Sequence, residues 1–478
     1  MSQELSKFYI SVTKKDDKII AYTSSTDIPS PSPIATDGES ASFDTVKEFN
    51  NIIDFSRLMR ETITAFDAYR KFITTLVAAA PLLPGKIAHD MVERFLSENG
   101  VLRQDLSRDD VHVYECSLGC YRQFAQRSER INAATQGAEL LPEIVIIGLI
   151  SAYDAFLTKL LRLVFNTKKE LIFGSSRQIP FSDLTKYDSI EDIRNSIIDK
   201  EIEAIIRESY HEQFEKMESK FGFPLKKGLL VWPKFIELCE RRNLLTHTGG
   251  IISKQYVENC ETHNVQNIGE IGQKLDVRIG YVVSSVNIVY EISIKLLYVL
   301  WRKFKTDEIS KADDCLHDLG YELVVDESYD LAEKILEFGK QTIAQFGGSD
   351  RTRRMMIINL ANTYRLRKRP ADAVRIVDSE DWSASSDDFS LCVAAIREDV
   401  SEIVRLMHKL GNTDAMLDAY RSWPIFRGLR RTPEMAAAFE AIFGESLIKP
   451  KSMETKVNDL AETPDLGQSE SAPSDTVH

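Results

Sequence analysis

Three polar residues in one short stretch of the chain have the types that phosphodiester chemistry requires. Arg242, Asn243 and His247 stand together in the sequence Arg-Asn-Leu-Leu-Thr-His. An imidazole can move a proton near neutral pH, and a fixed guanidinium can hold the extra negative charge of a five-coordinate phosphorus. The amide of Asn243 can orient the phosphate or the imidazole. The residue types therefore favour proton-transfer chemistry at a phosphate group.

The surrounding stretch, 232–250, predicts the helix that positions these side chains. Pro233 suits a first helical turn, and Gly249 with Gly250 supplies a left-handed helix end. One face repeats at the helical spacing i, i+3, i+4, i+7. Its members are Phe235, Leu238, Cys239, Arg242 and Leu245. Asn243 and His247 are four residues apart, so we expect them on one side of the helix.

A second helix is predicted at 141–165, where the sequence is apolar on nearly every side. Asp154 is the exception within it. A buried carboxylate without a partner is costly, so we expect a cation or a hydrogen-bond donor opposite Asp154. The alternative, which stays open, is that Asp154 lies on the helix surface and pairs with Lys159 or water.

The pattern Arg242-Asn243-x3-His247, followed by Gly249-Gly250, resembles the Arg-x4-6-His motif of the HEPN family. Ser151-x-x-Asp154 is similar to an acidic step on the first core helix of that family. The basic pair that some members carry after this acid is absent, since Thr158 stands there. The resemblance implies an all-α fold: a HEPN-like bundle of four or five helices that forms a homodimer, with two motifs facing each other.

The resemblance also implies an activity, metal-independent cleavage of RNA. The RNA 2′-hydroxyl would attack the adjacent phosphorus and leave a 2′,3′-cyclic phosphate, so DNA would not be a substrate. His247 would act as general acid and base, and Arg242 would bind the phosphate. Asn243, Asp154 and Arg241 would support them, with Asp154 orienting Arg242 or His247. Family members of this kind suggest a toxin or an antiviral defence effector.

Length and charge limit the possible functions. A chain of 478 residues predicts two or three domains, and a net charge of −13 argues against general binding of polyanions. Cys116 and Cys120 are the only close cysteine pair; with His112 they suggest a metal, but no second ligand pair has zinc-like spacing. We therefore expect reduced cysteines and no metal or cofactor.

The expected location is the cytoplasm. The N-terminus has no apolar signal segment, and the apolar run 144–152 is too short to span a membrane. We expect no membrane contact.

The chain divides into five expected regions. A short β-hairpin and a Pro/Ser-rich linker occupy 1–42, a helical accessory region 43–130, the HEPN-like bundle 131–308, a helical repeat region 325–446, and a disordered tail 447–478. Within the bundle, 173–225 is an excursion, and 277–304 a closing helix in which Asn287 and Glu291 are more typical of a helix surface.

The repeat region predicts an α-solenoid of helical hairpins, with helices near 331–346, 355–367, 371–377, 389–397, 400–410, 416–423 and 433–443. Asn359 to Tyr364, followed by Ala371 and Ala373, resembles a degenerate tetratricopeptide repeat. Its basic residues either form a groove for RNA or an acidic protein partner, or are balanced by neighbouring acids. They are Arg351, Arg353, Arg354, Arg365, Arg367, Lys368, Arg369, Arg427, Arg430 and Arg431.

Two other functions remain open. A non-catalytic scaffold would use the bundle to dimerise and the solenoid to bind a protein, and the net charge of −13 favours it. A nucleotide could also bind in the motif groove with a partner enzyme acting in trans, although the chain has no Walker loop. The presence of Arg242, Asn243 and His247 together favours the ribonuclease, with the solenoid as a sensor or docking arm.

Overall fold

The computed structural model describes residues 9–15, 18–24, 54–79, 94–102, 104, 114–173 and 187–448. The predicted linker, the start of the accessory region at 43, His112 and the predicted tail beyond 448 lie outside these residues. The described residues fall into two compact units, one before and one after Asp54, and each is described by itself.

The first unit contains the predicted hairpin. Strand β1 (Tyr9–Lys15) pairs antiparallel with β2 (Lys18–Ser24), and Lys15 lies opposite Lys18. Alternation of apolar and polar residues on both sides of Asp16 and Asp17 is the sequence signal for this hairpin. The prediction is confirmed.

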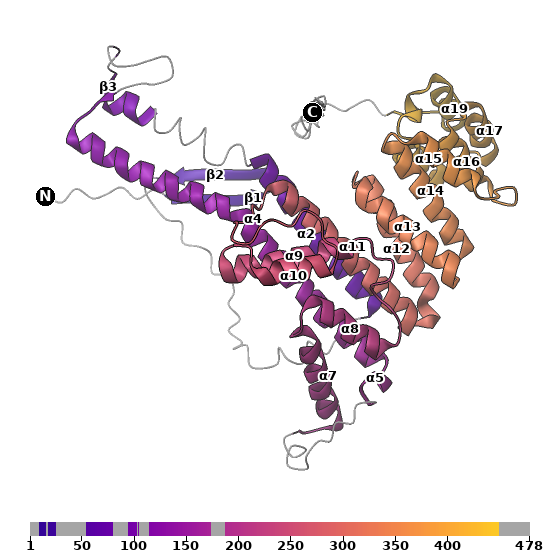
Figure 1. The fold of residues 1–478 in the computed structure, drawn as a ribbon. Helices are drawn as coiled ribbons and strands as arrows, with labels where there is room; N and C mark the ends of the chain where they lie inside the picture. The colour runs from indigo at the N-terminus through magenta and orange to yellow at the C-terminus, as the bar shows by residue number, and fades with distance from the viewer. Residues whose placement is uncertain are drawn as a thin grey trace, which may run out of the picture. The chain divides into compact units, whose positions relative to one another are not determined.

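The second unit is helical and is built around α11 (Ile279–Phe304). This helix packs against α2 (Phe55–Ala79), α4 (Leu118–Thr167) and α9 (Trp232–Thr248), as Figure 1 shows. Aromatic pairs join α2 to it, because the ring of Phe55 stacks on Trp301 with 6.0 Å between centroids. Thus α2, in the predicted accessory region, is part of the same bundle as the Arg-Asn-x3-His helix.

Helix α4 is one continuous helix of 50 residues and carries Pro142 in its interior. Its start is capped by Ser117, whose side chain accepts a hydrogen bond from the Cys120 N–H. The predicted division between 130 and 131 falls inside this helix. The second half of α4 supplies the core, with Leu149, Tyr153 and Leu160 fully buried.

Two helical segments have the length and composition that a membrane span requires: Gln136–Thr167 and Ile279–Phe304. The first is longer than the apolar run at 144–152. In the most apolar window of each, 50% and 78% of the residues are buried within the protein. Packing in the bundle core accounts for this apolar character of α11.

The polar excursion between the core helices forms α5 (Glu170–Phe173), α7 (Ile190–Ile206) and α8 (Tyr210–Phe221). Three elements were not predicted: the helix α10 (Lys254–Thr262) and the short antiparallel strands β3 (Val101–Leu102) and β4 (Tyr114–Glu115). The first helix of the C-terminal part, α12 (Ile309–Val325), was also missed.

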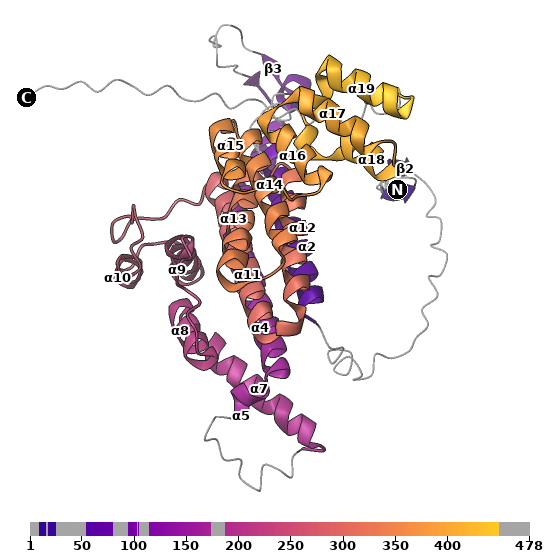
Figure 2. The same ribbon diagram turned by 90° about the vertical axis from the view of Figure 1, so that its right-hand side faces the viewer.

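The C-terminal helices follow the predicted order. They are α13 (Tyr329–Phe346), α14 (Asp350–Leu366), α15 (Pro370–Asp378), α16 (Asp387–Arg397), α17 (Val400–Leu410), α18 (Asp414–Ser422) and α19 (Pro433–Phe443), with 3-10 turns at Thr306–Glu308, Pro424–Phe426 and Leu429–Arg431. Successive helices pack against each other from α13 to α17, and α17 packs against α19. Figure 2 shows α11, α12 and α13 side by side. A Cβ atom on Gly320 would lie 2.4 Å from Leu336 Cδ2, so glycine permits the close approach of α12 and α13.

Buried charges tie α11 to these helices. Glu291 is 2% exposed and binds Lys295 on its own helix at 2.6 Å and Lys334 of α13 at 3.0 Å. The expectation that Glu291 lies on the helix surface is therefore wrong. Nearby, buried Asp313 of α12 accepts from Arg302 and from the Tyr298 hydroxyl. Because these charged groups are paired, the free-energy cost of removing them from water is offset.

Candidate functional site

Helix α9 has the predicted ends and the predicted buried face. Pro233 lies in its first turn, and Gly249 caps it in the left-handed region with φ of 62°. Phe235, Leu238 and Cys239 are fully buried. The face that buries these residues also directs Arg242, which is partly buried, toward α4 and α8.

Arg242 contacts Asp154 of α4 and Tyr210 of α8. Arg242 Nη2 donates to Asp154 Oδ2 at 3.0 Å and to the Tyr210 hydroxyl at 2.6 Å. The Tyr210 hydroxyl in turn donates to Asp154, 3.0 Å from Oδ1. We call these three residues the Arg242 triad. The expectation that a cation would face Asp154 is confirmed, whereas Lys159 pairs with Glu61 at 3.3 Å instead.

Asp154 is partly shielded from solvent. Burial raises the pKa of Asp154, while the hydrogen bond from Tyr210 and the charge of Arg242 act in the opposite direction without cancelling it. Burial also raises the pKa of Tyr210 far above its ordinary value, with Cys239 and Asp154 adding to the effect. Tyr210 is therefore a neutral hydrogen-bond donor in the triad and takes no part as a base.

The guanidinium of Arg242 keeps donors that the triad does not use. Its Nη1 donates to Asn243 Oδ1 at 3.2 Å, and its Nε is buried with no hydrogen-bond partner among the described residues. The Arg242 side chain is 21% exposed. A charged N–H without a partner is costly when buried, and such groups mark strain or a missing ligand. The partly exposed guanidinium is therefore the part of this site that an anion can approach.

His247 lies one turn beyond Asn243 and is exposed to solvent. Among the described residues, no hydrogen bond or ion pair holds its imidazole. The structure therefore brings together Asp154, Arg242 and Asn243 of the predicted site residues and leaves His247 at the adjacent surface. An exposed imidazole is free to reach a substrate, and it lacks the partner that would fix its orientation.

Arg241 faces another direction and does not join the triad. It donates to Glu237, with 2.7 Å between Nη2 and Oε1, and to the Asp276 carbonyl at 3.0 Å. Glu237 also accepts from the hydroxyls of Tyr256 and Tyr281. This second polar cluster attaches α9 to α10 and α11. The expected supporting role of Arg241 at the phosphate site gives way to a structural one, because its donors are occupied.

Tyr210 is the site residue that sequence reasoning missed. It begins α8, where Ser209 and Glu212 form a reciprocal capping box. That Ser-x-x-Glu pattern is visible in the sequence and fixes the helix start, hence the location of Tyr210 in the first turn. The sequence gives no signal, however, that α8 places this residue against α4 and α9.

No cluster of three or more His, Cys, Asp or Glu side chains with metal-ligand geometry occurs in the described part of the chain. Cys116 is half-buried and Cys120 is buried, and both are free thiols. His112 lies outside the described residues.

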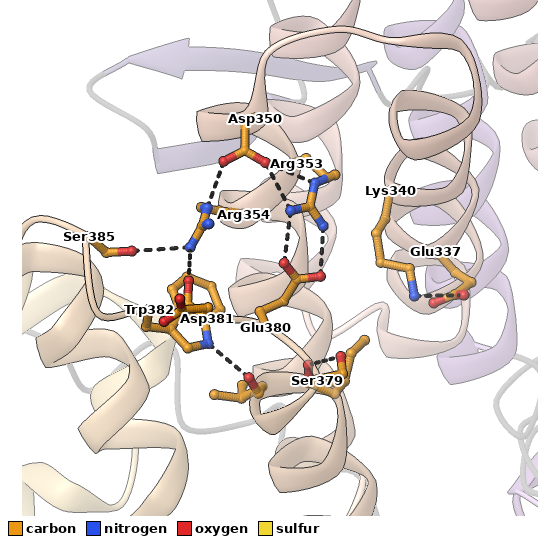
Figure 3. Close-up of polar contacts among 12 residues, drawn as sticks. Glu337, Lys340, Asp350, Arg353, Arg354, Ser379, Glu380, Asp381, Trp382 and Ser385 are labelled. Carbon is orange, nitrogen blue, oxygen red and sulfur yellow. Dashed lines mark hydrogen bonds and ion pairs between the residues drawn. The ribbon is translucent and has the colours of Figure 1, made fainter.

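The basic residues of the C-terminal helices are largely occupied by acids and carbonyl groups. Figure 3 shows Arg353 between Asp350 and Glu380, at 2.8 Å and 2.7 Å, and Arg354 bound to Asp350 at 2.7 Å. Arg365 donates to the carbonyls of Ala395 and Ile425, and Arg367 and Arg369 both bind Glu333. These contacts favour the alternative in which neighbouring acids balance the positive charge.

In comparisons with family models, curated proteins and solved structures, no match to this chain was found. The functional inference therefore rests on the residues of α4, α8 and α9 and on their contacts.

Proposed function

We propose that the protein is a metal-independent endoribonuclease in which Arg242 and His247 act on one phosphodiester. The observation that supports it most is the Arg242 triad. A partly buried acid and a neutral phenol hold the guanidinium of the Arg-Asn-x3-His helix, and this guanidinium remains partly exposed. Such preorganisation is effective for an anion whose charge grows during reaction.

In the proposed reaction, His247 removes the proton from the 2′-hydroxyl of the RNA. The 2′-oxygen forms a bond to phosphorus, and the bond from phosphorus to the 5′-oxygen breaks. The leaving 5′-oxygen takes up a proton, and the other product carries a 2′,3′-cyclic phosphate. Arg242 binds the non-bridging oxygens, and Asn243 supports the guanidinium through its Oδ1. DNA lacks the attacking group.

One imidazole cannot remove and supply a proton at the same moment. We therefore propose that two copies pair, so that a second His247 completes the site. Exposed apolar side chains beside the motif support pairing: Ile144 on α4, Ile251 just after α9, and Ile271. Their segments are joined, since Ile251 pairs with Lys274 and Lys274 lies 3.7 Å from Glu143.

The proposed setting is the cytoplasm, as a toxin or defence effector. With a net charge of −13, and with the arginines of α14 paired, general attraction for RNA is weak. Specific recognition would then depend on the Arg242 triad, or on the C-terminal helices acting as a docking arm for a protein.

The competing proposal is a scaffold that dimerises and binds a protein. The paired arginines of the C-terminal helices favour it, because they leave little free basic surface in the described residues for RNA. A scaffold does not need the unused donors of Arg242 or an exposed His247. The two proposals differ in what substitution of these residues does.

The test is incubation of purified protein with total RNA in EDTA, read on a denaturing gel. Wild type is compared with Arg242→Ala, His247→Ala and the matched control His408→Ala. His408 is also exposed in the last turn of a helix, α17. Cleavage by wild type and His408→Ala, but by neither motif variant, supports the ribonuclease. Cleavage by all four proteins indicates a contaminant, and loss of cleavage with His408→Ala also contradicts the proposal.

A further inference from the structure

A second site lies among the C-terminal helices. Helices α12, α14 and α16 and the turn Pro424–Phe426 line a partly open cavity of about 350 Å³. Its walls are mainly apolar and aromatic, with Tyr321, Phe389 and Trp423 among them. A cavity of this size with few polar groups is typical of small-molecule sites.

Asn362 of α14 supplies an unpartnered donor in this cavity. The residue is 2% exposed, and its Oδ1 accepts from Arg365 Nη2 at 3.2 Å. A guanidinium can only donate, so this contact fixes which end of the amide is oxygen. Within the described residues, no hydrogen bond reaches the Nδ2 amide group. Asn362 lines the cavity, and its two amide hydrogens are left for a ligand.

Asn359, one turn earlier on α14, supplies an acceptor. His317 Nδ1 lies 3.0 Å from Asp318 Oδ1, and its Nε2 lies 3.0 Å from Asn359 Nδ2. A carboxylate only accepts, so in the neutral imidazole Nδ1 carries the hydrogen and Nε2 accepts from Asn359. The amide oxygen of Asn359 therefore remains available. The cavity presents one donor and one acceptor from the same helix.

The floor of the cavity is fixed in place. Arg365, whose side chain is 8% exposed, also donates to the Ala395 carbonyl at 2.9 Å and to the Ile425 carbonyl. It joins α14 to α16 and to the turn. Burial raises the pKa of the Cys392 thiol to about 12, so the thiol in this wall stays protonated and is no nucleophile. These features suit binding and not catalysis.

Two opposite charges stand at the edge of the cavity. Arg351 is exposed and Asp388 is half-buried, and 3.8 Å separate Arg351 Nη2 from Asp388 Oδ2. The guanidinium of Arg351 lies 5.6 Å from the centroid of the Phe389 ring. The Arg351 guanidinium can bind one phosphate group, and the Asp388 carboxylate can accept hydrogen bonds from sugar hydroxyls. A longer nucleic-acid chain would bring a second phosphate near Asp388.

We propose that this cavity binds a free nucleoside monophosphate, with the base among Tyr321, Phe389 and Trp423. A nucleobase is a planar ring whose edge carries both acceptors and donors, which matches Asn362 and Asn359. Stacking on aromatic side chains is favourable for every base. This inference stands apart from the proposed ribonuclease, so Arg242→Ala binds the nucleotide as the wild type does.

The test is calorimetric titration of the full-length protein with AMP, GMP, CMP and UMP, with inorganic phosphate as a control. Asn362→Asp keeps the acceptor for Arg365 and removes the donor, so affinity falls by roughly tenfold or more. Asn359→Asp keeps the acceptor, so affinity changes by less than about threefold. Trp423→Ala removes an aromatic ring on which the base stacks, so affinity for the nucleotide falls by roughly tenfold. Asn412→Asp, an exposed Asn→Asp control between α17 and α18, leaves binding unchanged.

The proposal is overturned if none of the four nucleotides binds at millimolar concentration, or if inorganic phosphate binds as tightly as they do. Binding by Asn362→Asp at wild-type affinity overturns it as well, provided that circular dichroism shows an intact helical fold. Tighter binding of a short RNA oligonucleotide than of any mononucleotide contradicts the assignment to a free nucleotide. Loss of nucleotide affinity in Asn362→Asp and Trp423→Ala, but not in the control variant, supports the proposal.

Discussion

Arginines meet carboxylates in two regions of this protein with different results. In the C-terminal helices, Arg353 lies between two acids, and four of its contacts go to Asp350 and Glu380. In the bundle, Arg242 has one acid, Asp154, whose pKa is raised by burial despite its partners. In the part of the chain that the structure describes, the Arg242 Nε has no hydrogen-bond partner.

The difference shows that clusters of basic residues in a sequence do not by themselves mark an anion site. The arginines of α14 follow one another closely in the chain, and their charge joins helices to each other. Arg242 faces one acid, and its guanidinium stays partly exposed, so it is able to attract a phosphate. What matters is the number of acids facing each arginine.

The comparison predicts opposite outcomes for the two arginines. Arg242→Ala should lower the rate of RNA cleavage by about a hundredfold or more, since a fixed donor to the transition state is lost. Arg353→Ala should leave cleavage unchanged and lower the free energy of unfolding by about 1–3 kcal/mol, because two carboxylates lose hydrogen bonds. Rates on a labelled RNA and thermal denaturation of each variant measure both. Equal loss of cleavage in the two variants would contradict the assignment of Arg242 to the reaction and of Arg353 to the fold.

Pairing of two copies can be broken without touching the triad. Ile271→Glu places a charge on the exposed apolar surface beside the motif. We expect the molar mass in solution to fall to that of one chain and cleavage to drop by about tenfold or more, because the second His247 is removed. Light scattering coupled to size exclusion gives the mass. Ile190→Glu, at an exposed position of α7, is the control.

The Tyr210→Phe variant tests whether the Tyr210 hydroxyl helps to position Arg242 in the triad. The substitution removes the hydroxyl between Arg242 and Asp154 while preserving the ring, which packs 5.9 Å from Phe235. Loss of one positioning hydrogen bond should lower kcat by about tenfold and change KM little. Steady-state kinetics on a short RNA separate the two parameters. An unchanged kcat would show that Asp154 alone orients the guanidinium.

The smallest effect concerns stability and pH. Burial raises the pKa of Asp154 above its ordinary value of 3.8, so the folded protein binds this proton more strongly than the unfolded chain. Stability that Asp154 contributes in its protonated form is therefore lost as pH rises from 3.8 through the folded pKa. The Asp154→Asn variant does not titrate there, and its Tm should rise relative to wild type over that window.

Altered hydrogen bonds in Asp154→Asn can shift its Tm by an amount that does not depend on pH. The test is therefore how the difference in Tm between the variant and the wild type changes with pH. Melting curves of both proteins at a series of pH values supply it. A difference that moves in favour of the wild type as pH rises would mean that the Arg242 charge outweighs burial at Asp154.

Local signals in the sequence were sufficient for most helices and for one contact of the site. Pro233, the buried face and Gly249 fixed α9, because capping and periodicity are properties of consecutive residues. Asp154 was expected to meet a cation because an isolated buried carboxylate is costly, and it does meet Arg242. The hairpin at the N-terminus followed from alternation alone.

Other features depend on contacts between distant residues and were beyond the sequence. Tyr210 joins the triad only because α8 returns to α4. Arg241 and Arg242 are neighbours in the chain, yet helical rotation directs one to Glu237 and the other to Asp154. Glu291 has the sequence context of a surface residue and is buried because Lys334, far along the chain, pairs with it.

The central helix α11 belongs to both regions at once. Its buried Glu291 binds Lys334 of α13, and its Arg302 binds Asp313 of α12, while other faces of α11 pack on α2, α4 and α9. A truncation that keeps the motif helix and ends before α12 would uncover these charges and remove their partners. Melting of one region therefore removes support from the other, so α11 and the helices packed on it should unfold in a single cooperative transition.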